Sequence, residues 1–143
     1  MLIGKIKLLP FLCVTSFLLF SQMALGQSNI VRTLYFKKNN FKIEKKHFRT
    51  LNEIGQRCAS DTFSFLKIFA YADKKGTKKY NEQLSEKRAN AVYSFLTQKF
   101  NVDTKKIYVT WLGEETEGAY DLHFPSARVQ QRCVDILVFF KKP

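Results

Sequence analysis

Two residues of opposite charge, Asp73 and Arg88, are the part of this sequence best suited to chemistry. Asp73 follows an apolar run at 63–71 and precedes a Lys-Lys-Gly turn. Arg88 lies four residues after Leu84 and four before Val92, so it projects from the apolar stripe of a predicted helix. An arginine there must reach the helix edge, pair with a carboxylate, or serve a site. Since clefts in α/β sheets form at the carboxyl ends of strands, the two residues are predicted to form either a structural ion pair or a binding site.

Catalytic and metal-binding signatures are absent from the sequence. It contains no glycine-rich phosphate loop, no Gly-x-Ser-x-Gly and no Cys-x-x-Cys motif. His47 lies beside a helical apolar stripe, where a structural histidine is favoured over a catalyst. The residues that could be imagined as a zinc set match no short ligand spacing; they are His47, Cys58, His123 and Cys133. The sequence therefore predicts no enzyme, no metal site and no cofactor.

The charge of the chain favours an anionic partner. It carries 24 Lys+Arg against 12 Asp+Glu, a formal net charge of +12 over 143 residues. Such an excess suits nucleic acid, a membrane surface or an acidic polymer. A nucleic-acid reader would concentrate this charge on one face. The six lysine doublets are instead predicted to be spread over loops and helix backs: 37–38, 45–46, 74–75, 78–79, 105–106 and 141–142. We therefore predict a solvated basic surface that can attract an anionic envelope polymer, and no nucleic-acid partner.

Residues 1–26 have the pattern of a secretory signal peptide. Two lysines precede an apolar run at 8–20, and Ala24-Leu25-Gly26 has small residues where a signal peptidase cleaves. The 13-residue run is short for a membrane span, which needs about 20 residues, so cleavage is favoured over a retained anchor. Only two lysines of the chain's charged residues fall in this segment, so the predicted product, 27–143, has 117 residues and a net charge of +10.

Two cysteines, Cys58 and Cys133, remain in the predicted product. In an oxidising compartment such a pair can form a disulfide. Two unpaired buried thiols are an equal alternative, because free cysteine behaves as a small core residue. The sequence leaves both possibilities open.

Strands and helices alternate along the predicted product. The β-branched and aromatic runs predict strands at 31–36, 63–71, 107–112 and 133–140, and helical spacing of apolar residues predicts helices at 43–58 and 81–100. The polar stretch 113–131 is predicted to contain a short helix around Arg128. This β-α-β-α-β-loop-β order implies one domain, a two-layer α/β (α+β) sandwich with its helices packed on one sheet.

The segment from Tyr71 to Val92 resembles the core motif of the OmpA-like peptidoglycan-binding domain. That family has the approximate pattern T-D-x-x-G-x-x-x-Y-N-x-x-L-S-x-x-R-A-x-x-V. The matching positions here are Asp73, Gly76, Tyr80, Asn81, Leu84, Ser85, Arg88, Ala89 and Val92. Further matches are Gly113-Glu114 and the segment 128–135, which is similar to the family's R-A-x-N-R-R-V-E. The resemblance covers about residues 31–140.

The resemblance implies an exported, non-catalytic module that binds peptidoglycan non-covalently through the diaminopimelate of the stem peptide. In the family the residues matching Asp73 and Arg88 engage the ammonium and carboxylate of diaminopimelate. Asn81 is expected to order the loop, Leu84 to form an apolar wall, and Ala72 and Arg132 to belong to the site. The implied location is the periplasm, with outer-membrane or other envelope proteins as further partners.

Three departures from the family pattern bear on binding. Ala72 replaces a threonine, Lys37-Lys38 replaces an acidic strand end, and Cys133 replaces the second arginine of the R-R pair. These changes motivate an alternative, an envelope structural or interaction protein that keeps the fold and has lost or weakened peptidoglycan binding.

Overall fold

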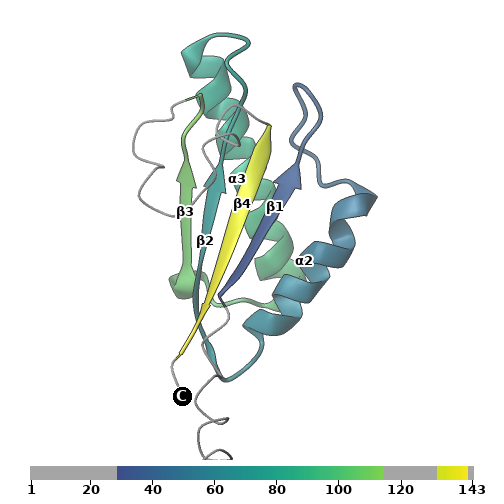
Figure 1. Ribbon diagram of the computed structural model, residues 1–143, viewed down its shortest axis with the longest axis vertical. Helices are drawn as coiled ribbons and strands as arrows, with labels where there is room; N and C mark the ends of the chain where they lie inside the picture. The colour runs from purple at the N-terminus through teal and green to yellow at the C-terminus, as the bar shows by residue number, and fades with distance from the viewer. Residues whose placement is uncertain (1–28, 115–131, 142–143) are drawn as a thin grey trace, which may run out of the picture.

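In the computed structural model the described residues are 29–114 and 132–141. The elements along the chain are β1 (Ile30–Tyr35), α2 (Lys45–Cys58), β2 (Phe63–Ala70), α3 (Lys78–Phe100), a short 3₁₀ turn at Thr104–Lys106, β3 (Ile107–Trp111) and β4 (Cys133–Phe140) (Figure 1). The predicted α/β fold is confirmed. The predicted signal peptide and the short helix around Arg128 lie outside the described residues.

The four strands form one sheet in the order β1-β4-β2-β3. Strand β4 runs antiparallel to both β1 and β2, whereas β2 and β3 are parallel. Strands β1, β2 and β3 therefore end at the same edge of the sheet, where β4 begins. The register confirms this, because Tyr35 lies opposite Cys133, and Ala70 lies opposite both Val134 and Trp111. We call this edge, with the loops that follow the three strands, the site end.

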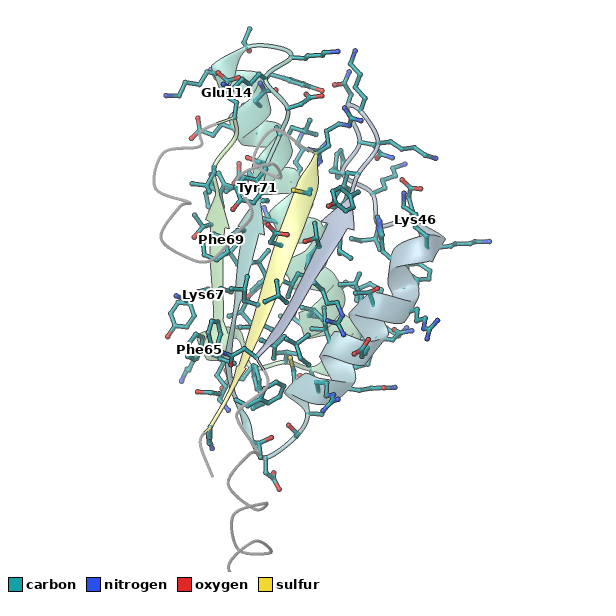
Figure 2. The ribbon with its side chains drawn as sticks, viewed as in Figure 1. Lys46, Phe65, Lys67, Phe69, Tyr71 and Glu114 are labelled. Carbon is teal, nitrogen blue, oxygen red and sulfur yellow. The ribbon has the colours of Figure 1, made fainter. Side chains whose placement is uncertain are left out.

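The core lies between the sheet and the two helices, which cover the same face (Figure 1). Alternate residues of β2 face the helices and are fully buried, whereas Phe65, Lys67 and Phe69 project from the other face (Figure 2). The buried side chains that meet in this layer include Leu51, Ile54, Leu66, Ile68, Val92, Leu96, Ile136 and Val138. Burial of such side chains contributes about 1.5–3 kcal/mol each, which fixes the helices on the sheet.

Helix α3 begins at Lys78, three residues before the predicted start. Gly76 has a φ of 121°, which favours glycine, and it turns the chain out of β2. Thr77 then caps the helix, because its hydroxyl accepts a hydrogen bond from the backbone N–H of Tyr80. The helix ends at Phe100, and the next residue, Asn101, has a φ of 51° and forms a left-handed C-cap.

The two cysteines do not form the disulfide that the sequence left open. Neither sulfur takes part in a disulfide, and both side chains are buried. Cys133 opens β4 at the site end, whereas Cys58 closes α2 just before β2 begins at Phe63, at the opposite edge. They are thus separated by roughly the length of β2, about 3.3 Å for each of its residues, and a disulfide needs Cα atoms within about 7 Å.

Two further features of the described residues concern membranes and metals. Neither helix within 29–114 combines the length and the apolar character needed to cross a bilayer. Among these residues no three His, Cys, Asp or Glu side chains gather as a metal site, and His47 and Cys58 lie near opposite ends of α2. His47 is buried against the ring of Phe36, with ring centroids 5.6 Å apart, and this burial lowers its pKa.

Gly55 is required by the contact between α2 and α3. A Cβ atom at this position would lie 2.3 Å from the ring of Phe100. We predict that Gly55→Ala lowers the free energy of unfolding by about 1–3 kcal/mol, because overpacking outweighs the gain in helix propensity. Urea denaturation measures this change. In a Phe100→Ala background the same substitution should become neutral or stabilising, and an equal loss in both backgrounds would contradict the steric cause.

Both cysteine thiols should be inert in the folded protein. Burial raises the pKa of Cys58 to about 12, so little reactive thiolate exists at neutral pH. We expect iodoacetamide to label neither Cys58 nor Cys133 in native protein and both in non-reducing guanidinium, as measured by peptide mass spectrometry. A peptide pair joined through these two residues would contradict the fold.

Candidate functional site

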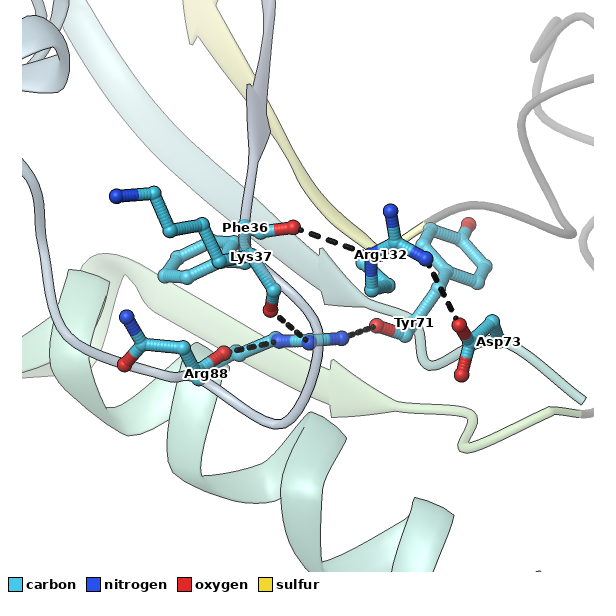
Figure 3. Close-up of polar contacts among 7 residues, drawn as sticks. Phe36, Lys37, Tyr71, Asp73, Arg88 and Arg132 are labelled. Carbon is cyan, nitrogen blue, oxygen red and sulfur yellow. Dashed lines mark hydrogen bonds and ion pairs between the residues drawn. The ribbon is translucent and has the colours of Figure 1, made fainter. Parts of the chain in front are cut away.

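Arg88 is fully buried and binds three backbone carbonyl oxygens at the site end. Its Nε donates to Asn40 O at 2.9 Å, Nη1 to Tyr71 O at 2.7 Å and Nη2 to Lys37 O at 3.3 Å (Figure 3). Its guanidinium carbon lies 5.4 Å from the centroid of the Phe36 ring. These contacts tie the loop after β1 to the end of β2.

Burial of this guanidinium has an electrostatic cost. It lowers the pKa of Arg88, and the nearby charge of Asp73 opposes that shift. The charge-assisted hydrogen bonds to carbonyl oxygens offset the lost hydration. An arginine can therefore be buried on this face of α3, because backbone carbonyls after β1 and β2 accept hydrogen bonds from its guanidinium.

Asp73 pairs with Arg132 rather than with Arg88. Nη1 of Arg132 lies 2.9 Å from Oδ2 of Asp73, and Nε of Arg132 donates to Phe36 O at 3.3 Å (Figure 3). The Arg132 side chain is 42% exposed and that of Asp73 is 14% exposed. A fixed anion and a fixed cation thus lie side by side at the surface. Asp73 follows β2, and Arg132 directly precedes β4.

Asn81 and Ser85 attach the end of β3 to α3. The Asn81 amide donates to Oε2 of Glu114 at 2.7 Å, and the Ser85 hydroxyl accepts from the backbone N–H of Gly113 at 3.0 Å. Gly113 O in turn accepts from Ala72 N at 2.7 Å. Ala72, one residue before Asp73, is therefore held by the same set of contacts.

The Asn81 side chain lies next to the turn that carries Asp73. Among the described residues its Oδ1 is buried and has no hydrogen-bond donor. A Cβ atom at Gly76 would lie 3.3 Å from this oxygen. Asn81 therefore packs against the turn, and its loop-ordering role stays a prediction.

Leu84 lies on the same buried face of α3 as Asn81 and Arg88, one turn before Arg88. It is 5% exposed and forms part of a shallow pocket of about 70 Å³ with Asn39, Phe41, Tyr80, Gln83 and Lys87. A larger pocket of about 290 Å³ is lined by Lys78, Glu82, Trp111, Leu112, Gly113 and Glu114. Neither of these two pockets is lined by Asp73 or Arg132.

The predicted site residues thus divide into four groups. Asp73 and Arg132 are in direct contact, Ala72 and Asn81 belong to the network that holds the turn, Leu84 lines the pocket of about 70 Å³, and Arg88 forms a group of its own. Arg88 is below the surface with all three of its nitrogens bonded to carbonyls, so a direct ligand contact by Arg88 remains a prediction. Sequence reasoning missed Ser85 as a structural link, although its spacing with Asn81 and Arg88 (i, i+4, i+7) places all three on one helix face.

Comparison with known proteins places this geometry in a family. The model of the OmpA family matches residues 35–132. Outer membrane protein 41 of Porphyromonas gingivalis is 33% identical over 86 residues, 60% of this chain and 22% of that protein. The peptidoglycan-associated lipoprotein of Buchnera aphidicola is 34% identical over 67 residues, 47% of this chain and 39% of that protein. The chain therefore spans well under half the length of these two relatives.

A solved structure has the same fold. The peptidoglycan-associated lipoprotein from Burkholderia pseudomallei superimposes with a TM-score of 0.60 at 24% identity, over 77% of this chain and 90% of that one. The family match covers more than half of the chain and includes the turn after β2, the start of α3 and the first residue before β4. The chain belongs to the OmpA family.

Proposed function

We propose that this protein is a non-catalytic module of the bacterial cell envelope that binds peptidoglycan non-covalently. Membership of the OmpA family supports this proposal, as does the similarity to a peptidoglycan-associated lipoprotein. The predicted signal peptide agrees with a periplasmic location, and the related outer membrane protein agrees with a position near the outer membrane.

The observation that carries the proposal is the exposed ion pair of Asp73 and Arg132. We propose that it recognises the diaminopimelate of the stem peptide, whose side chain ends in an ammonium and a carboxylate. Asp73 would accept the ammonium, and the planar fork of Arg132 would bind the carboxylate through two donors. The ligand would then replace one internal ion pair by two ion pairs across the interface.

Arg88 has a positioning role in this proposal. It joins the backbone of Lys37 and Asn40 to that of Tyr71, two residues before Asp73. Because Arg132 also donates to Phe36 O, both members of the exposed pair depend on the same backbone. Arg88 would thus set the separation of Asp73 and Arg132 without touching the ligand.

The first test is co-sedimentation of the protein with purified peptidoglycan sacculi. We expect Asp73→Ala and Arg132→Ala each to weaken binding by at least about tenfold, since each removes a charge-assisted contact. Asp61→Ala and Arg57→Ala change the same residue types at the opposite edge and should bind as wild type does. If wild type stays in the supernatant, the alternative of an envelope interaction protein is favoured. If Asp73→Ala pellets fully, the site assignment is wrong.

The second test separates positioning from contact at Arg88. Lysine cannot reach three carbonyls in different directions, so Arg88→Lys should lower the free energy of unfolding by about 2–4 kcal/mol. Arg132→Lys at the surface should change it by less than about 1 kcal/mol while weakening sacculus binding. Urea denaturation and sedimentation measure the two effects. An Arg88→Lys variant that keeps wild-type stability and fails to bind would show that Arg88 contacts the ligand directly.

A further inference from the structure

The fold brings lysines that are far apart in the sequence to one end of the molecule. The loops that follow β1 and β2 both lie at the site end, and helices α2 and α3 both begin there. Four of the six lysine doublets fall in these loops and first helical turns: 37–38, 45–46, 74–75 and 78–79. These four doublets lie in loops and at helix starts, and strand direction brings them to the same end of the molecule.

The densest part of this charge follows β1. Residues 37–49 contain five lysines and one arginine against a single acid, Glu44. All six are exposed, and we call them the basic rim: Lys37, Lys38, Lys42, Lys45, Lys46 and Arg49. Glu44 is shared, because Oε2 lies 3.6 Å from both Lys37 Nζ and Lys46 Nζ. Most of the positive charge in the rim is therefore uncompensated within this segment.

The position of these lysines does not favour the fold. The first turns of α2 and α3 contain lysine and no acidic residue. Cations at a helix N-terminus are opposed by the helix dipole, and neighbouring cations repel one another. An external anion at the site end would relieve both effects.

The rim lies beside the exposed ion pair. Arg88 holds the carbonyl of Lys37, at the start of the rim segment, and the carbonyl of Tyr71, next to the Asp73 turn. Figure 3 shows Lys37 and Asp73 on either side of the two arginines. A polymer that places one stem peptide on Asp73 and Arg132 and runs toward the loop after β1 would therefore bring its neighbouring peptides to the basic rim.

We propose that the basic rim is a second contact surface for the same polymer, binding the free carboxylates of stem peptides adjacent to the one held at Asp73. This proposal rests on the proposed function. Lysine suits the role, because it is a flexible point charge that can follow carboxylates at variable spacing, whereas the Asp73–Arg132 pair requires one geometry. The rim adds attraction and association rate that salt screens, and the ion pair supplies selectivity.

The test measures sacculus binding of the purified protein against salt concentration. A rim variant carries Lys38→Gln, Lys42→Gln, Lys45→Gln and Lys46→Gln. A matched control loses four charges at the opposite edge through Arg57→Gln, Lys105→Gln, Lys106→Gln and Lys141→Gln. We expect the rim variant to bind about tenfold more weakly at low ionic strength, with a shallower salt dependence, and to approach wild type at high salt. The control should stay within about twofold of wild type, and the thermal unfolding midpoint of the rim variant should not fall.

Several outcomes overturn the inference. Equal losses in the rim variant and the control would mean that total charge alone attracts the protein. Rim-dependent binding to vesicles of anionic phospholipid, with no rim effect on sacculi, would assign the surface to a membrane. If Asp73→Ala abolishes binding while the rim variant binds normally, the rim proposal alone fails. If Asp73→Ala binds normally and the rim variant does not, the proposed site fails while the rim remains a polymer contact.

Discussion

The buried guanidinium of Arg88 is the interaction on which the site end depends. It binds carbonyls from the loop after β1 and from the end of β2, two segments that are not neighbours in the sheet because β4 lies between β1 and β2. At this end the backbone hydrogen bonds from Phe36 N to Arg132 O and from Tyr71 N to Cys133 O extend the pairing of β4, and Arg88 adds a side-chain link between the ends of β1 and β2. Asp73 and Arg132 are attached to this frame through Tyr71 and Phe36. Removal of the guanidinium would take away the Arg88 donors of Asn40 O and Tyr71 O, whereas Lys37 O would keep the backbone N–H of Asn40, and both loops would be free to move.

Much of the fold could be predicted from the sequence, because it depends on apolar periodicity. Strand β2 and helices α2 and α3 carry the patterns that bury one face, and the structure changes only their ends. Helix α3 begins earlier than predicted because Thr77 caps it. A cap is a local hydrogen bond that the pattern of apolar residues does not reveal. The importance of Arg88 was also visible, because a charged residue on a buried stripe needs partners. Its actual partners were not, because backbone carbonyls carry no sequence signature.

The candidate site was harder to predict where it depends on strand register. Asp73 and Arg132 are 59 residues apart and meet because β4 lies beside β2 with Ala70 opposite Val134. No local pattern gives that register. The lysine doublets are a similar case: their number is plain in the sequence, but the end of the sheet at which each falls follows only from strand direction. The fold thus places a basic surface around one acid and one arginine, which combines general attraction with a specific ion-pair geometry.

The most direct measurement is a titration of isotopically labelled protein with two soluble stem tripeptides, one ending in diaminopimelate and the other in lysine. The two peptides differ only by the carboxylate at the end of the side chain. If the Asp73–Arg132 pair recognises the zwitterion, the diaminopimelate peptide should shift the NMR signals of these two residues and bind at least about tenfold more tightly than the lysine peptide. Equal affinity for both peptides, or shifts confined to residues away from the site end, would contradict the account.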